Sequence, residues 1–180
     1  MKRISKILFT LGLILILGSV SLNMYTKYKQ NQAKNKFTQK IENREEIKDI
    51  NLGDEIGLID IPSLNISTAI VSGTGKDQIK YYVGHFENTP MPGDNGNFCI
   101  AGHSSTIYNN IFNDLHKIKI DDEIIITTSN GEFIYVVNDI FETEPTNMGV
   151  LSQDNDLKEL TIVTCSNQGK DRLIVKARLK

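Results

Sequence analysis

Near its C-terminus the chain reads LTIVTC at residues 160–165, SNQGKD at 166–171 and RLIV at 172–175. Apolar, β-branched runs on either side of a short polar segment that contains Gly169 are typical of two strands joined as a β-hairpin. Cys165 ends the first strand and Arg172 begins the second. The pattern therefore predicts a thiol beside a permanent cation at the mouth of a hairpin.

A histidine ends another apolar run earlier in the chain. The residues FCIA at 98–101 are followed directly by Gly102 and His103. A cysteine can act as a nucleophile, a histidine can carry a proton, and an arginine can stabilise a developing oxyanion. We therefore expect His103, Cys165 and Arg172 to form a catalytic set.

These same residues carry a family resemblance. The segment TIVTC at 161–165 is similar to the sortase signature Thr-Leu-x-Thr-Cys, with an Arg on the next strand and a Gly-His upstream. Ile162 stands where the family usually has Leu, which is a small change at an apolar position. The resemblance covers roughly residues 55–180. It implies an all-β dominated fold, a closed eight-stranded sortase-type β-barrel with short helices.

The strand pattern of this region is consistent with that fold. Many short apolar runs with turn residues between them favour a closed antiparallel barrel. The triplet Ser129-Asn130-Gly131 is a strong hairpin signal between two of these runs. The expected strands include 56–61, 67–71, 124–128 and 133–137, and short helices are expected at 76–82 and 107–115.

The N-terminus carries a nearly continuous apolar segment at residues 7–24. As a helix it would measure roughly 27 Å, just enough to cross a hydrocarbon core. Lys2, Arg3 and Lys6 precede it, which predicts an inside N-terminus, a single-pass anchor in the cell membrane and an extracellular catalytic domain. A cleaved signal peptide is the alternative, because residues 19–21 offer a small-x-small pattern.

These boundaries divide the chain into four parts. We expect a cytoplasmic basic tail at 1–6, a transmembrane anchor at 7–24, a polar linker at 25–54 and the sortase catalytic domain at 55–180. Apolar residues are sparse in the linker, which favours a mobile, partly helical stalk over a stable independent helix. A helix that binds a partner is the alternative.

Composition excludes several other classes of protein. A net charge of −2 with interspersed signs gives no basic field for nucleic acid, and neither of the two cysteines lies in a zinc-type pattern. We expect Cys99 to be a core residue without a disulfide, and His85 and His116 to be surface or packing residues. Some class A sortases bind calcium through an acidic loop, but Glu142 and Glu144 alone are weak ligands, so we predict no metal and no cofactor.

The resemblance also implies a function. A sortase is a membrane-anchored cysteine transpeptidase that cleaves a Leu-Pro-x-Thr-Gly-like sorting signal through a thioacyl intermediate. Its partners are surface proteins that bear this signal, and the acceptor is an amine of a cell-wall precursor or a pilin. Water takes the place of the acceptor when no amine is present, so the enzyme is then a hydrolase.

The subtype and two competing interpretations remain open. The segment between Val137 and Leu160 is too short for the inserted helix of class B, which leaves classes A and D, with D favoured. A cysteine hydrolase of another fold is one alternative, although papain-like enzymes place the cysteine before the histidine. A membrane-anchored β-barrel binding or adhesion module without catalysis is the other.

Overall fold

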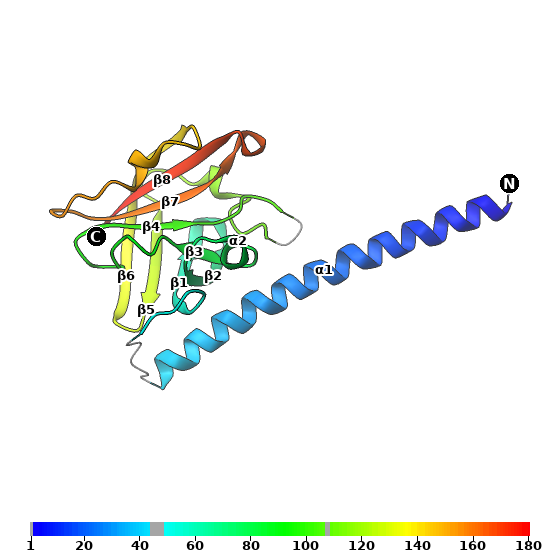
Figure 1. Ribbon diagram of the computed structural model, residues 1–180, viewed down its shortest axis with the longest axis horizontal. Coiled ribbons are helices and arrows are strands. Elements are labelled where there is room, and N and C mark those ends of the chain that lie inside the picture. The colour runs from blue at the N-terminus through cyan, green and yellow to red at the C-terminus, as the bar shows by residue number, and fades with distance from the viewer. Residues whose placement is uncertain (1, 44–48, 107–108) are drawn as a thin grey trace.

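The computed structural model describes residues 2–43, 49–106 and 109–180. One long helix, α1 (Lys2–Glu42), runs past one side of a barrel and extends far beyond it (Figure 1). The barrel strands within these residues are β1 (Glu55–Ile61), β2 (Ile66–Ser72), β3 (Val83–His85), β4 (Gly96–Ala101), β5 (Glu123–Thr128), β6 (Gly131–Thr143), β7 (Lys158–Ser166) and β8 (Asp171–Leu179). Short helices interrupt them: η1 (Pro62–Leu64), α2 (Lys76–Ile79), η2 (Leu115–Lys117), η3 (Met148–Leu151) and η4 (Asn167–Gly169).

The eight strands close in the order β1-β2-β3-β4-β7-β8-β6-β5. The closed eight-stranded barrel predicted from the sequence is confirmed, but its antiparallel character is only partly right. β2 pairs with β3 in parallel, and β4 pairs with β7 in parallel. A parallel pair needs a crossover, and here the β5–β6 hairpin lies in the connection between β4 and β7. Such long-range pairing leaves no local signal in the sequence.

The barrel is filled by side chains that alternate along each strand. Phe98 and Ile100 of β4, with Leu160 and Ile162 of β7, are at most 1% exposed and belong to one apolar core. Their neighbours in sequence point to the outside of the sheet, as the two-residue period of a strand requires. Thr161, Val163 and Cys165 therefore lie on the outer face of β7.

Residues 25–42 of the expected polar linker are helical and pack on the barrel, whereas the sequence favoured a partly helical stalk. These residues continue α1 without a break to Glu42. Ala33 and Phe37 of α1 pack against Leu58 of β1 and Ala69 of β2, and Phe37 is fully buried. The few apolar residues suffice because they share one stripe of the helix, which covers the outer face of two strands.

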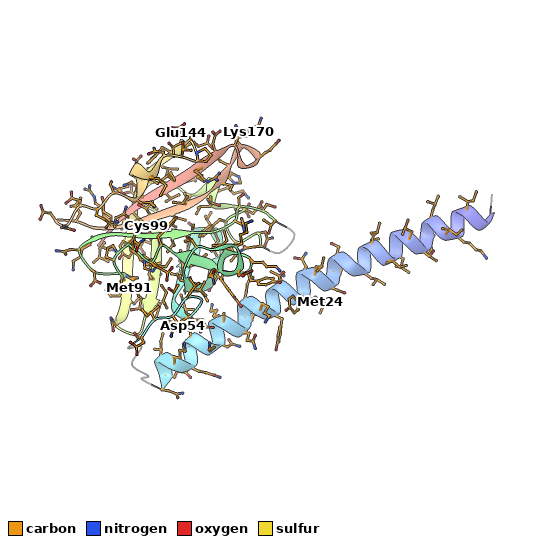
Figure 2. All side chains as sticks on the ribbon, viewed as in Figure 1. Met24, Asp54, Met91, Cys99, Glu144 and Lys170 are labelled. Atoms are coloured by element: carbon orange, nitrogen blue, oxygen red, sulfur yellow. The ribbon has the colours of Figure 1, made fainter. Side chains whose placement is uncertain are left out.

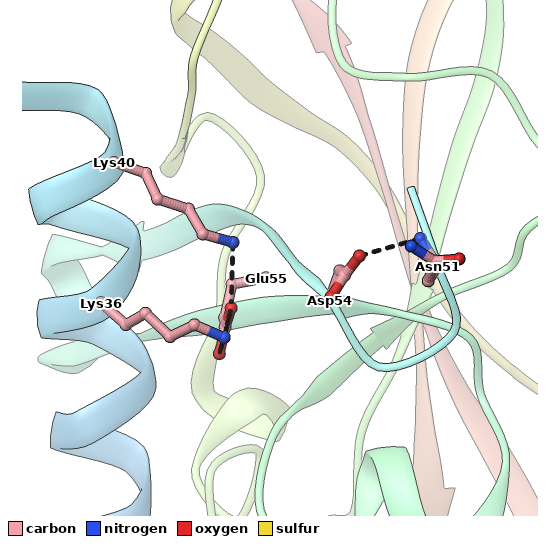
Figure 3. A network of polar contacts seen from close by, with 5 residues as sticks. All are labelled: Lys36, Lys40, Asn51, Asp54 and Glu55. Carbon is pink, nitrogen blue, oxygen red and sulfur yellow. Dashed lines mark hydrogen bonds and ion pairs between the residues drawn. The ribbon is translucent and has the colours of Figure 1, made fainter. Parts of the chain in front are cut away.

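Polar contacts also join α1 to the barrel. Lys36 Nζ and Lys40 Nζ lie 2.8 Å and 3.3 Å from Glu55 Oε2, and Glu55 is only 8% exposed (Figure 3). In the turn just before Glu55, the backbone N–H of Asn51 donates to Asp54 Oδ2 at 2.9 Å and lowers the pKa of Asp54. This polar network fixes the start of β1 against the last turns of α1.

The helix expected at 107–115 is wrong over the described residues 109–115. Residues 109–110 have no regular structure, 111–114 form turns, and a single 3-10 turn, η2, begins at Leu115. Asn109 explains the difference, because its Oδ1 accepts from the Ile111 N–H at 2.9 Å and its Nδ2 donates to Ile79 O at 2.9 Å. Such side-chain bonds compete with helical ones. The rest of the expected helix, at 107–108, lies outside the described residues.

Candidate active site

The β7–β8 hairpin brings Cys165 and Arg172 together. The two residues are direct cross-strand partners in the register of β7 and β8. Both lie on the outer face of the barrel, since Thr164 and Leu173 beside them are buried. Directly opposed residues have Cβ atoms about 4.5–5.5 Å apart. The thiol and the cation predicted at the hairpin mouth are therefore neighbours through the sheet itself.

The parallel pairing of β4 and β7 brings in the histidine. Ala101 pairs with Val163, and the Gly102 N–H donates to Val163 O at 3.2 Å. The Thr164 hydroxyl donates to Gly102 O at 2.8 Å. His103 therefore leaves its strand beside the end of β7 that carries Cys165.

His103 and Cys165 line one open hollow of about 500 Å³ on the outside of the barrel. Both side chains are half-buried. The rest of the wall is polar and comes from the loops that follow β4 and β7. These wall residues are Ser104, Ser105, Thr106, Ser166, Asn167, Gln168 and Gly169.

Burial affects the protonation of one histidine and one cysteine, His103 and Cys99. The pKa of His103 lies below its ordinary value of 6.5 because burial disfavours the imidazolium. Burial raises the pKa of Cys99 to about 12, so that thiol stays neutral. A neutral imidazole can accept a proton, and a neutral buried thiol is a poor nucleophile.

Close packing holds the turn before His103. The His103 carbonyl oxygen accepts a hydrogen bond from the Phe112 N–H at 3.2 Å. A Cβ at Gly102 would lie 2.8 Å from two atoms of the Phe112 ring, closer than real Cβ contacts allow. A glycine is therefore required at this point, which accounts for the Gly-His pair in the sequence.

Arg172 is not among the residues that line this hollow, but its guanidinium is tied to Gly169, which is. Its Nη1 donates to Gly169 O at 3.2 Å and to Asp171 O at 3.1 Å. Arg172 also lines a groove of about 190 Å³ that runs over the outer faces of β6, β7 and β8. The structure thus brings His103 and Cys165 into one hollow, and it places Arg172 between that hollow and the groove.

The groove was not predicted from the sequence. Its wall is mostly apolar and is completed by η3, which covers the sheet. The sequence signal for this groove was a set of apolar residues within a polar stretch. The lining residues are Phe86, Thr143, Glu144, Pro145, Asn147, Met148, Val150, Leu151, Val163, Arg172 and Ile174. Glu144 and Lys170 mark this end of the barrel in Figure 2.

The remaining cysteine and histidines lie apart from the hollow. Cys99 is fully buried, and both cysteines are free thiols. His85 packs against the Phe98 ring and lies 3.0 Å from the Thr89 hydroxyl through Nε2. His116 is exposed on η2. Among the described residues, no group of three His, Cys, Asp or Glu side chains is arranged to hold a metal ion.

Comparison with known proteins agrees with this geometry. The family model described as the Sortase domain matches residues 59–180, more than half of the chain. The chain therefore belongs to the sortase family. It is 45% identical to a Clostridium perfringens Sortase D5 transpeptidase of known structure, with a TM-score of 0.78 over 84% of this chain and 98% of that one.

Other relatives carry related names. Sortase D of Bacillus subtilis is 29% identical over 78% of this chain and 64% of its own length, and Sortase A of Streptococcus agalactiae is 26% identical over 69% and 53%. The chain thus spans between about half and two thirds of these curated relatives. A Clostridium perfringens sortase C, solved with the C-terminal cell wall sorting motif, superposes with a TM-score of 0.69 at 28% identity over 83% of this chain and 86% of that one.

Proposed function

We propose that the protein is a cysteine transpeptidase that cleaves a Leu-Pro-x-Thr-Gly-like sorting signal and transfers the cut protein to a cell-wall or pilin amine. The observation that carries this proposal is the hollow shared by His103 and Cys165. Membership of the sortase family supports it, as do the transpeptidase and sorting-motif relatives.

The first half of the reaction forms a thioester. The Cys165 thiol gives its proton to the neutral His103 imidazole, and the sulfur attacks the carbonyl carbon of the substrate threonine. The C–N bond to glycine then breaks, and His103 returns the proton to the leaving amine. The threonine acyl group remains bonded to Sγ of Cys165.

The second half restores the enzyme. An incoming amine attacks the thioester while His103 accepts its proton, and the new amide forms as the thiol leaves. Water resolves the thioester in the same way when no amine is present. Arg172 exchanges its contacts with Gly169 O and Asp171 O for hydrogen bonds to the tetrahedral oxygen in each half.

The apolar groove supplies a place for the peptide before the scissile bond. Val163 lies two residues before Cys165 on the same face of β7, and Arg172 lies opposite Cys165 on β8. Val163 and Arg172 both line the groove. An extended peptide laid over these residues leads its threonine to the thiol. Burial of the leucine and proline side chains against Met148, Val150 and Ile174 provides the binding energy.

Intact-mass spectrometry of the full-length protein in detergent tests this function. A Leu-Pro-x-Thr-Gly peptide should leave a thioacyl adduct on the wild-type chain and none on the Cys165→Ala protein. Added amine should convert the adduct into a ligated product. Binding of the peptide without any adduct would identify a non-catalytic binding module instead.

We propose further that residues 7–24 are an uncleaved anchor that leaves the barrel outside the cell. Within the described part, α1 contains a segment of mean hydropathy 2.1 with none of it buried, long and apolar enough to cross a membrane. Protease added to protoplasts should digest the barrel, and the protein should fractionate with membranes. A mature N-terminus near Asn23 would show that the segment is a signal peptide.

A further inference from the structure

The direction of the apolar half of α1 is fixed by the half that packs on the barrel. Gln30 Nε2 donates to Tyr81 O at 3.1 Å, and Lys34 Nζ donates to Ser67 Oγ. From there α1 continues as one helix past the barrel (Figure 1). The level at which the helix becomes apolar is therefore fixed relative to the barrel surface.

At that level α1 carries the residues typical of a membrane interface. Tyr25 and Tyr28 are 49% and 61% exposed, and Lys27 and Lys29 lie beside them. Tyrosines favour the boundary between hydrocarbon and water, and lysines favour anionic headgroups. This short segment follows the last apolar residue of the proposed span.

The barrel contributes the same two residue types next to this segment. The Tyr81 ring lies edge-on to the Tyr25 ring, with centroids 6.0 Å apart. Lys80 Nζ lies 5.2 Å from the centroid of the Tyr81 ring. α2, which directly precedes Lys80, carries Lys76 and Asp77, and Lys27 and Lys29 lie on α1, so residues 25–29 and 76–80 together carry four lysines and one aspartate.

A hollow of about 620 Å³ separates α1 from the loop after β4. Its helix side is largely apolar and its loop side is polar, which suits a molecule with an apolar and a polar end. Thr26 is among its lining residues, and the Thr26 hydroxyl is buried and has no partner among the described residues. The helix side includes Ile14, Leu15, Gly18 and Leu22, and the loop side includes Ser105, Thr106, Asn109 and Asn110.

We propose that the barrel itself lies on the membrane surface and binds anionic phospholipid headgroups through Tyr25, Tyr28, Lys80 and Tyr81. A headgroup with the upper part of its acyl chains fills the hollow beside α1. This inference rests on the proposal that residues 7–24 span the membrane. It adds a second contact, made by the folded domain.

The contact has a consequence for the catalytic site. Ser105 and Thr106 line both the hollow beside α1 and the hollow that contains His103 and Cys165. Headgroups in the first hollow therefore lie one loop away from the thiol. The site works at the membrane surface rather than at the end of a free tether.

Tryptophan fluorescence of the full-length protein in vesicles tests the inference, because the chain has no tryptophan of its own. Three single variants report three positions: Leu15→Trp in the span, Tyr81→Trp on the proposed face, and Ser129→Trp in the β5–β6 turn, away from the apolar half of α1 (Figure 1). Asp77→Trp, exposed on α2, is a second probe if Tyr81→Trp fails to fold. The lipids carry bromine near the headgroup end of their chains for the barrel probes, and near the far end of their chains for Leu15→Trp, which lies at the centre of the proposed span.

Phosphatidylglycerol vesicles should quench Tyr81→Trp or Asp77→Trp strongly and leave Ser129→Trp unquenched. Quenching at the barrel face equal to that of Ser129→Trp would overturn the contact, and equal quenching in phosphatidylcholine would overturn the assignment to anionic headgroups. Loss of quenching in Leu15→Trp would overturn the span, and with it this inference. Peptide cleavage measured in the same vesicles tests the proposed reaction separately.

Discussion

The Thr164 hydroxyl donates to the Gly102 carbonyl at 2.8 Å, so a residue adjacent to Cys165 holds the residue adjacent to His103. This single bond crosses between β7 and β4, whose parallel pairing Figure 1 lets the reader follow. It lies inside the sheet, where Thr164 is only 3% exposed. Together with the bond from the Gly102 N–H to Val163 O, it therefore helps to set the distance between the proposed nucleophile and proton carrier.

Thr164→Val should lower kcat for peptide cleavage while leaving KM nearly unchanged, because it removes one of the two hydrogen bonds that hold Gly102 on β7 and changes no residue that lines the groove. An unsatisfied buried carbonyl should also cost about 1–3 kcal/mol of unfolding free energy. Thr164→Ser should restore both values. Thr161→Val is the matched control. The buried Thr161 hydroxyl donates to Asn97 Oδ1 at 2.8 Å, and neither residue lines the proposed site. Equal losses of kcat in the two valine variants would contradict a positioning role.

The two cysteines should respond differently to alkylation and to replacement. Burial raises the pKa of Cys99 to about 12, whereas Cys165 lines an open hollow. Iodoacetamide at neutral pH should therefore modify Cys165 alone, as read by peptide mapping. Cys165→Ala should abolish cleavage in a folded barrel, and Cys99→Ala should keep most of it. Loss of activity in both variants would count against Cys165 as the nucleophile.

Arg172→Ala should lower turnover about a hundredfold or more, since loss of an oxyanion donor costs about 2.7–4 kcal/mol. Arg172→Lys should recover little, because an ammonium cannot reproduce the guanidinium fork. Arg178→Ala is the control on the same face of β8, where an exposed ion pair with Glu159 spans 3.3 Å. Steady-state cleavage assays decide, and near-normal turnover without Arg172 would make it a bystander.

His103 should titrate below its ordinary value of 6.5, because burial lowers its pKa. The folded protein then holds fewer protons than the unfolded chain at acid pH. The contribution of His103 to folding stability is present above its pKa in the unfolded chain and is lost as the pH falls through its lower pKa in the folded protein. NMR titration of the three histidines, with His103→Gln to assign the signal, measures the value. A midpoint above 6.5 would refute this.

Phe37→Ala should loosen α1 from the barrel. Phe37 is fully buried, and truncation of a buried phenylalanine typically costs about 3–5 kcal/mol. Hydrogen exchange should then speed up in the last turns of α1, and the unfolding temperature in detergent should fall. Phe9→Ala is the matched control on the same helix, because Phe9 is 74% exposed. Similar exchange in both proteins would mean that the packing does not hold the helix.

The sequence predicted those parts of the structure that local pattern controls. The run ending at Cys165, its polar turn and Arg172 specified a hairpin, because alternation and turn residues act over a few positions. Residue chemistry at the strand ends and the family resemblance both suggested His103 as a partner, but no local pattern placed it beside Cys165, since the pairing of β4 with β7 is long-range. The packing of Phe37 was missed because two or three apolar residues look too few until the strands they cover are known.

Because α1 runs as one helix from its apolar half to Phe37, it also fixes the direction in which the barrel faces around the axis of that apolar half. One residue added between Met24 and Ala33 turns everything beyond it by about 100° around the helix axis and moves it by about 1.5 Å. If residues 7–24 span the membrane as proposed, the proposed catalytic hollow would then point in a different direction relative to that span. Seven added residues nearly restore the original facing and lift the barrel by about 10 Å. The length of this segment therefore sets both the rotation of the barrel about the helix axis and its displacement along that axis.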